Sequence, residues 1–133
     1  MSEKLGLYKC EVCGNLVQVI LAGVGELVCC GEPMTLLKPH YNDNQETSEK
    51  HVPVFVDKND EGEEIRIGST LHPTEHDHYI QFIEVISEDN KSLKLKYLTP
   101  GEAPIMELKE KATNEKAKAY CNIHGLWEGN KND

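Results

Sequence analysis

The sequence lacks long hydrophobic runs. Hydrophobic residues make up 38% of the 133 positions and charged residues 28%, and no run approaches the roughly 20 apolar residues that a membrane helix needs. We therefore expect no membrane partner. Residues 1–5 also lack the basic start, apolar stretch and small-residue cleavage site of a secretory signal, which favours a cytoplasmic location.

Basic side chains are scarce as well. Arg66 is the single arginine, and the formal net charge is −9. Because proteins bind phosphate backbones through clustered lysine and arginine, this charge argues against nucleic acid as a partner. An anionic substrate would need a local positive group to overcome the overall repulsion.

The sequence also has no convincing amphipathic helix. Beyond the polar stretch 38–50, short β-like runs are separated by turn residues, and residues 92–97 alternate strictly between polar and apolar. The remaining runs are 52–56, 64–67, 79–86, 104–108 and 117–127. Roughly seven strands of this kind predict a mainly β fold, an antiparallel immunoglobulin-like β-sandwich or barrel.

The chain is long enough to hold a small module in front of this β domain. Residues 8–34 contain four cysteines but too few apolar residues to fold without a metal. We place the boundary at the polar stretch, so that residues 1–37 form a four-cysteine module and residues 38–133 form the β domain.

The four cysteines of this module form two pairs. Cys10 and Cys13 make a C-x-x-C followed by Gly14, a turn that aims backbone N–H groups at sulfur and brings two thiolates together. Cys29 and Cys30 are adjacent, and consecutive extended residues point to opposite sides, so the chain must twist for both to reach one ion. We predict a distorted tetrahedral site, which four thiolates alone assign equally to zinc or iron. The odd total of five cysteines and a reducing cytoplasm disfavour a disulfide framework.

Histidine is frequent, with six in the chain, and the fifth cysteine lies near the last of them. Several imidazoles with one thiolate suit a redox transition metal and leave a position open for substrate. Cys121 and His124 are three residues apart, so we expect His124 to reach the same ion through its nearer ring nitrogen, Nδ1. Spacing does not decide between His72 and His76, because His76 and His78 form an H-x-H pair that a strand would present on one face. The candidate ligands are His51, His72, His76, His78, Cys121 and His124.

With both groups of residues in order, the chain resembles the desulfoferrodoxin family, the two-iron superoxide reductases. The resemblance covers almost the whole chain, and four motifs in this order make it specific. The motifs are the C-x-x-C and Cys-Cys pairs, Glu49-Lys50-His51-Val52-Pro53, His72-Pro73 with His78-Tyr79-Ile80, and Cys121-Asn122-Ile123-His124-Gly125.

The resemblance implies one-electron reduction of superoxide to hydrogen peroxide at a mononuclear, non-haem iron centre that protects against oxidative stress. It implies that Lys50 draws superoxide in and that Glu49 occupies the sixth position of the ferric iron. His76 becomes a loop residue and His40 a linker residue. The implied ligands are four equatorial imidazoles, His51, His72, His78 and His124, with an axial thiolate, Cys121.

The resemblance also implies a second, rubredoxin-like iron that the chemistry does not need. Its ligands are Cys10, Cys13, Cys29 and Cys30, in a desulforedoxin-like module. A small rubredoxin-like electron donor and a homodimer are further implications. Some family members carry a carboxylate two residues before the ligating cysteine, where this chain has Ala119, and contacts around the sulfur tune the redox potential.

Two other functions are compatible with parts of the sequence. In a rubredoxin-like electron-transfer or metal-storage protein, the four-cysteine module would carry the function and the histidines would be incidental. A non-haem oxygenase would use two histidines and one carboxylate. That reading leaves Cys121 unexplained.

Overall fold

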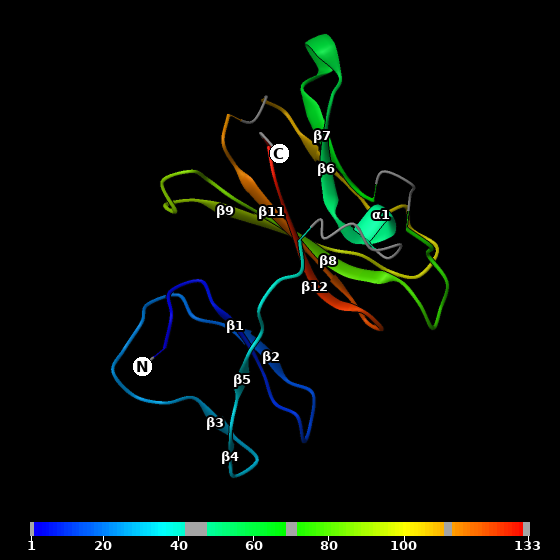
Figure 1. Cartoon of the computed structure of the whole chain (residues 1–133). Coiled ribbons are helices and arrows are strands. Elements are labelled where there is room, and N and C mark those ends of the chain that lie inside the picture. The colour runs from blue at the N-terminus through cyan, green and yellow to red at the C-terminus, as the bar shows by residue number, and fades with distance from the viewer. Residues whose placement is uncertain (1, 42–47, 69–71, 111–112, 132–133) are drawn as a thin grey trace. The chain divides into compact units, whose positions relative to one another are not determined.

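The structure is a computed structural model of the chain and describes residues 2–41, 48–68, 72–110 and 113–131, with the side chains of residues 48 and 49 left out. The chain divides into two compact units, Met1–Lys38 and Pro39–Asp133 (Figure 1). Each unit has its own sheets. Among the described residues, no helix is both long and apolar enough to cross a bilayer.

The first unit is built from very short strands. A three-stranded antiparallel sheet has the order β2-β1-β5, and β3 pairs with β4 in a hairpin. The strands are β1 (Leu7–Lys9), β2 (Leu16–Gln18), β3 (Val28–Cys29), β4 (Glu32–Pro33) and β5 (Thr35–Leu36). Its described buried hydrophobic residues are only Leu7, Tyr8, Cys10 and Val19. A core this small needs a further link, such as a metal, to hold its loops together.

The second unit contains two antiparallel sheets. One sheet has the order β10-β7-β6 and the other β12-β11-β8-β9 (Figure 1). The elements are α1 (Ser48–His51), β6 (Pro53–Asp57), the short 3-10 helix η1 (Asn59–Glu61), β7 (Glu63–Ile67), β8 (Ile80–Ile86), β9 (Leu93–Tyr97), β10 (Ile105–Leu108), β11 (Lys116–Cys121) and β12 (Gly125–Asn130). The prediction of a mainly β, sandwich-like fold that follows a four-cysteine module along the chain is confirmed.

The core of the second unit comes from the alternation of its strands. Along β11, Ala117, Ala119 and Cys121 are fully buried, and the residues between them are half-buried on the other face. This alternation follows from the two-residue repeat of an extended chain. The buried residues pack with others from β7, β8 and β10, so Cys121 continues a row of core side chains.

The two sheets form an open sandwich, because no pairing joins β9 to β10 among the described strands. Two lysines of β9 reach across this seam to the edge of β10. Lys94 Nζ donates to the carbonyl of Glu107 at 3.1 Å, and Lys96 Nζ donates to the carbonyl of Ile105 at 3.0 Å. The alternative of a barrel is therefore wrong, and side chains cover the edge carbonyls that another strand could pair with.

The last β-like run of the sequence is divided in the structure. Residues 117–127 were expected as one run, but the strands β11 and β12 form a hairpin whose turn is residues 122–124. Gly125 begins β12 with φ +80°, a conformation that residues with a side chain rarely adopt. The turn places Cys121 at the end of one strand and His124 just before the other.

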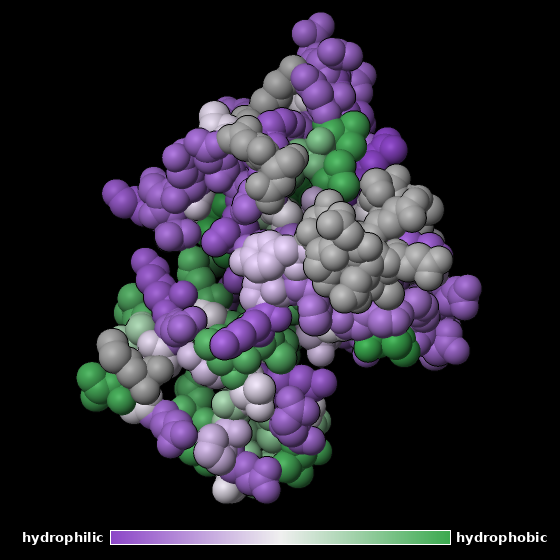
Figure 2. Space-filling view, viewed as in Figure 1, coloured by the Kyte–Doolittle hydropathy of each residue, from purple (hydrophilic) through white to green (hydrophobic). Residues whose placement is uncertain are grey.

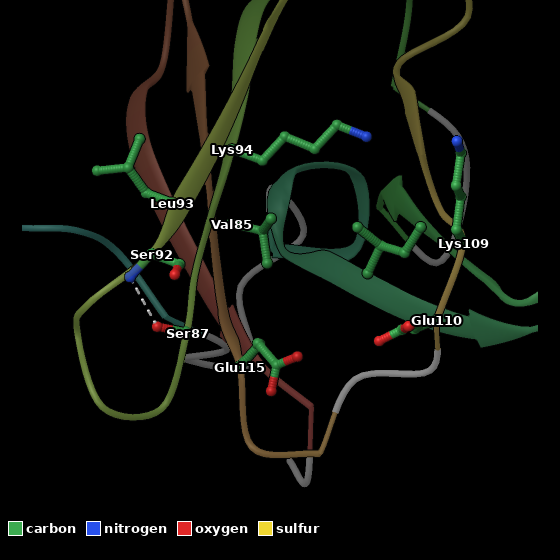
Figure 3. Close-up of a pocket in the computed structure, with 9 residues that line it drawn as sticks. Val85, Ser87, Ser92, Leu93, Lys94, Lys109, Glu110 and Glu115 are labelled. Atoms are coloured by element: carbon green, nitrogen blue, oxygen red, sulfur yellow. Dashed lines mark hydrogen bonds between the residues drawn. The ribbon is translucent and has the colours of Figure 1, made fainter.

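A surface hollow of about 390 Å³ lies at the other ends of these strands (Figure 3). It is formed where β8 ends, β9 begins, β10 ends and β11 begins, around Val85. Its lining contains Lys94, Lys109, Glu110 and Glu115 but no histidine or cysteine. The hollow is therefore separate from the metal-ligating side chains.

Candidate metal centres

The four cysteines of the first unit meet at one point. Each offers a sulfur within 4.8 Å of the other three, and none is in a disulfide. Cys13 Sγ lies 3.6 Å from Cys29 Sγ, and Cys29 Sγ lies 4.0 Å from Cys30 Sγ. Four sulfurs about 2.3 Å from one ion would be about 3.8 Å apart. The group therefore has the size of a tetrahedral metal site.

Backbone conformation lets two adjacent cysteines join this group. Cys30 has φ +53°, in the left-handed region, and Gly31 follows with φ +76°. A residue with a side chain adopts this conformation at some cost in energy. The reversal turns the Cys30 side chain toward the side on which Cys29 lies, which is the twist that the sequence requires.

The thiol pKa values in this group diverge. The backbone N–H of Cys13 donates to Cys10 Sγ at 3.4 Å and lowers the pKa of Cys10 to about 7. The neighbouring thiols, Cys13 foremost, raise the pKa of Cys30 to about 12. Four thiolates so close together repel one another, so all four can ionise only around a cation. The donor set therefore fits a metal ion.

A second group of donors lies at one end of the sandwich. His51, His78, Cys121 and His124 each offer one ligand atom within 4.8 Å of the other three. His72 joins them, since its Nε2 lies 3.1 Å from His51 Nε2 and 3.5 Å from Cys121 Sγ. Donors about 2.1 Å from one ion are about 3 Å from their neighbours. The five atoms are close enough to surround a single ion.

The four imidazoles form a closed ring. Successive ring centroids lie 4.6 Å apart for His51 and His72, 4.8 Å for His72 and His78, 5.1 Å for His78 and His124, and 4.7 Å for His124 and His51. The centroids of His51 and His78 are 6.4 Å apart, farther than any successive pair. The imidazoles therefore occupy four corners, with His51 and His78 opposite each other.

The sulfur of Cys121 faces this ring from the core. Cys121 is fully buried, and its Sγ lies 3.8 Å from His124 Nδ1. At Tyr120 and Cys121 the pairing of β11 with β8 shifts register, a bulge of the kind that redirects a side chain. The nitrogen of His124 that faces the sulfur is Nδ1, the one that the three-residue spacing favours.

Each ligating loop is held by its own hydrogen bonds. His51 ends α1, and one residue separates it from β6. The backbone N–H of His72 donates to the carbonyl of Ile67 at the end of β7 at 3.0 Å. A tight turn precedes β8, in which Glu75 and His78 exchange backbone hydrogen bonds of 3.0 and 3.1 Å. Both sheets therefore contribute ligands at the same end of the sandwich.

The protonation of the imidazoles suits metal binding. His72 Nδ1 lies 2.7 Å from the carbonyl of Pro73, so Nδ1 carries the proton and Nε2 is left as the ligand atom. Burial lowers the pKa of His72 to about 4, which keeps the ring neutral near pH 7. His78 Nε2 is buried and has no hydrogen-bond partner among the described residues. A metal ion would satisfy that nitrogen.

Burial also affects the thiol. It raises the pKa of Cys121, and the backbone N–H groups of His124 and Ile123 act in the opposite direction. A bound cation would favour the thiolate that burial disfavours. Neutral imidazoles with one thiolate are donors for a redox transition metal such as iron. The second donor set therefore fits a metal ion too.

Other predicted residues have different surroundings. His76 is exposed and lies outside the group. Lys50 is exposed in α1, next to His51, and the side chain of Glu49 is outside the described residues. His40 was expected in a linker, but its backbone is hydrogen-bonded to β12. The N–H of His40 donates to the carbonyl of Leu126, and the N–H of residue 128 donates to the carbonyl of His40, both at 2.9 Å. Ala119 is fully buried in the core.

Two residues beside the ligands were missed by the sequence interpretation. Asn122 hydrogen-bonds through its side chain to the loop that carries His78. Trp127 packs on His51, with ring centroids 4.8 Å apart and planes inclined by 23°, and its Nε1 donates to the carbonyl of His124 at 3.1 Å. Their closeness in sequence to Cys121 and His124 was the one available signal.

Comparison with known proteins gives a consistent result over both units. Residues 2–37 match the family model "Desulfoferrodoxin, N-terminal domain", and residues 43–130 match the model "Desulfoferrodoxin". A desulfoferrodoxin homolog of Archaeoglobus fulgidus is 46% identical over 128 residues, which cover 96% of this chain and 98% of the relative.

Solved structures also resemble the chain. The crystal structure of the superoxide reductase from Treponema pallidum matches with a TM-score of 0.67 at 21% identity, over 97% of this chain and 99% of that one, and supports the fold. The superoxide reductase (neelaredoxin) from Ignicoccus hospitalis matches with a TM-score of 0.50 at 27% identity, over 70% of this chain and 90% of that one. The two family models and the relative at 46% identity show that the chain belongs to the desulfoferrodoxin family.

Proposed function

We propose that the chain is a superoxide reductase, an oxidoreductase with two mononuclear iron sites. One superoxide anion takes one electron from the enzyme and two protons from solvent, and hydrogen peroxide leaves. The observation that carries the proposal is the ring of four imidazoles with a buried thiol on one side. Five donors of this kind leave one position of an octahedron for an anion.

The five donors would hold the catalytic iron, which supplies one-electron redox chemistry at an open coordination position. Pro73 fixes the tautomer of His72 through the 2.7 Å hydrogen bond to Nδ1. Trp127 fixes the ring of His51 by packing against it. The proposed iron ligands are His51, His72, His78, His124 and Cys121.

Lys50 is proposed to attract superoxide. Its side chain is exposed, and it immediately precedes His51 in α1. The net charge of −9 repels an anion at long range, so a lysine beside the centre can raise the rate of encounter locally. Glu49 is proposed to take the sixth position of the ferric centre, as the family resemblance implies.

The four-cysteine group holds the second iron through its four sulfurs, and we propose that superoxide reduction does not need it. A rubredoxin-like protein is the proposed electron donor, and the proposed location is the cytoplasm. We also propose a homodimer. Exposed hydrophobic side chains on the first unit support it (Figure 2). They are Val12, Ile20, Leu21, Val24 and Val28.

Rapid mixing of the anaerobically reduced protein with superoxide tests the function. We expect second-order oxidation of the histidine and cysteine centre with a thiolate-to-iron absorption band, and one hydrogen peroxide released for each superoxide consumed. Cys121→Ser should abolish this reaction while the spectrum of the four-sulfur site is retained. Full activity in Cys121→Ser would refute the proposed ligand, and release of dioxygen from superoxide would refute the proposed reaction.

A further inference from the structure

Trp127 contacts two imidazoles. Its ring centroid lies 4.8 Å from that of His51, with planes inclined by 23°, and 4.8 Å from that of His40, with planes inclined by 38°. Trp127 itself is 3% exposed, whereas His40 is exposed. Three aromatic rings in contact therefore run from the protein surface to a proposed iron ligand.

The outer ring of this series is held in place. Backbone hydrogen bonds of 2.9 Å to Leu126 and from residue 128 fix His40 beside β12, where it forms a parallel bridge with Trp127. The indole Nε1 of Trp127 also donates to the carbonyl of His124 at 3.1 Å. Trp127 thus contacts the side chain of His51 and the backbone of His124. These two histidines are neighbours among the four that surround the proposed iron site.

We propose that His40 and Trp127 form the route by which electrons from a donor protein reach the catalytic iron. This inference rests on the proposed function. One electron leaves the donor, which is oxidised by one unit, and the ferric centre is reduced by one unit, with no bond made or broken. Contacting conjugated rings favour such a transfer because they replace gaps across which electronic coupling decays steeply.

The route defines where the donor docks. The electron must enter at His40, the exposed member of the stack, so the donor covers this part of the second unit. His40 contacts Trp127 and not the iron ligands in the described contacts, so its ring can be removed without removing a ligand. If the stack had a purely structural role, this change would affect reduction by every reductant equally.

The experiment compares His40→Ala with His40→Phe, which restores an aromatic ring. Tyr97→Ala is a matched control, since Tyr97 is an aromatic residue 79% exposed on β9, which pairs with β8 and with no other described strand. In the full-length, iron-loaded protein, the oxidised catalytic centre is reduced by reduced rubredoxin and, separately, by dithionite. Loss of its thiolate-to-iron band gives each rate.

We expect His40→Ala to slow reduction by rubredoxin severalfold and to leave reduction by dithionite, iron content and reduction potential unchanged. His40→Phe should restore much of the rate, and Tyr97→Ala should behave like the wild type. An unchanged rate with rubredoxin, equal slowing with both reductants, or a shifted potential would overturn the inference.

A second readout does not depend on iron. Trp127 is the single tryptophan, so the tryptophan emission of the metal-free chain, excited at a wavelength that tyrosine does not absorb, reports on the surroundings of this one ring. His40→Ala should change the emission intensity, whereas Tyr97→Ala should not; identical spectra for wild type and His40→Ala would contradict the contact. Oxidation of the reduced wild-type centre by superoxide tests the proposed function separately, because it requires no donor.

Discussion

The side chain of Asn122 holds the backbone of Tyr79. Its Oδ1 accepts a hydrogen bond from the Tyr79 N–H at 3.0 Å, and its Nδ2 donates to the carbonyl of Asp77 at 2.9 Å. The backbone N–H of Asn122 also donates to the Tyr79 carbonyl at 3.3 Å. One residue therefore connects the hairpin turn of Cys121 and His124 to the loop of His78.

Asn122→Ala is expected to weaken iron binding in the second unit. Residues that orient metal ligands typically contribute about 10–100-fold to metal affinity, and this variant frees the His78 loop. Competition with a chelator, followed by the visible spectrum, measures the loss. Asn122→Asp keeps the acceptor for Tyr79 and loses the donor to Asp77, so its affinity should be intermediate.

Ile123→Ala is the matched control for this prediction. Ile123 is 60% exposed in the same turn, and its backbone is unchanged by the substitution. It should retain the wild-type iron affinity. Equal affinities for Asn122→Ala and Ile123→Ala would show that the hydrogen bonds do not position the ligand.

Gly129→Ala should disturb both stability and the position of His51. A methyl group at Gly129 would lie 2.3 Å from the carbonyl oxygen of Pro53, which follows His51 by two residues. Relieving such overpacking costs about 1–3 kcal/mol. Thermal unfolding should therefore occur at lower temperature, and iron should be lost more readily. Gly23→Ala, where the added methyl meets nothing within 4 Å, should match the wild type in both measurements.

Cys13→Ser separates the two iron sites. It removes one of four sulfurs from the first unit, so the iron content should fall from two per chain to one and the red colour of the four-sulfur site should disappear. The rate of reaction with superoxide should stay close to the wild-type value. An electron-transfer protein would instead lose its function, so loss of superoxide reduction in a folded variant would favour that alternative.

Lys50→Ala tests local attraction of the substrate. Removing the positive charge next to His51 should slow the second-order reaction with superoxide and flatten its dependence on ionic strength, because screened attraction no longer contributes. Lys91→Ala is the control, because it removes the same charge from an exposed position in the turn between β8 and β9. If both variants show the same rate and salt dependence, Lys50 does not steer the substrate.

The metal sites follow from short-range patterns to a large extent. The C-x-x-C turn, the twist at Cys29 and Cys30, and the Nδ1 orientation of His124 depend on residues within a few positions of one another, so spacing and backbone stereochemistry predict them. The strands of the second unit were also predicted within a few residues, because their alternation between apolar and polar positions is local.

The remaining features depend on tertiary contacts. The choice of His72 over His76 depends on where β7 ends relative to β8, and the sequence alone left it open. His40 looked like part of a linker because its neighbours are polar, but pairing with β12 fixes it. The role of Asn122 could not be predicted, since its partners lie more than 40 residues away.

The ligands of the second unit come from both sheets at one end of the sandwich, whereas the other end has the open hollow beside Val85. An ion bound by these ligands would link β6, β7, β8 and the β11–β12 hairpin to one another at the ligand end. Local opening should then begin at the hollow, far from the iron. Hydrogen exchange should be graded along the strands in the iron-loaded protein, and that gradient should disappear when iron is removed.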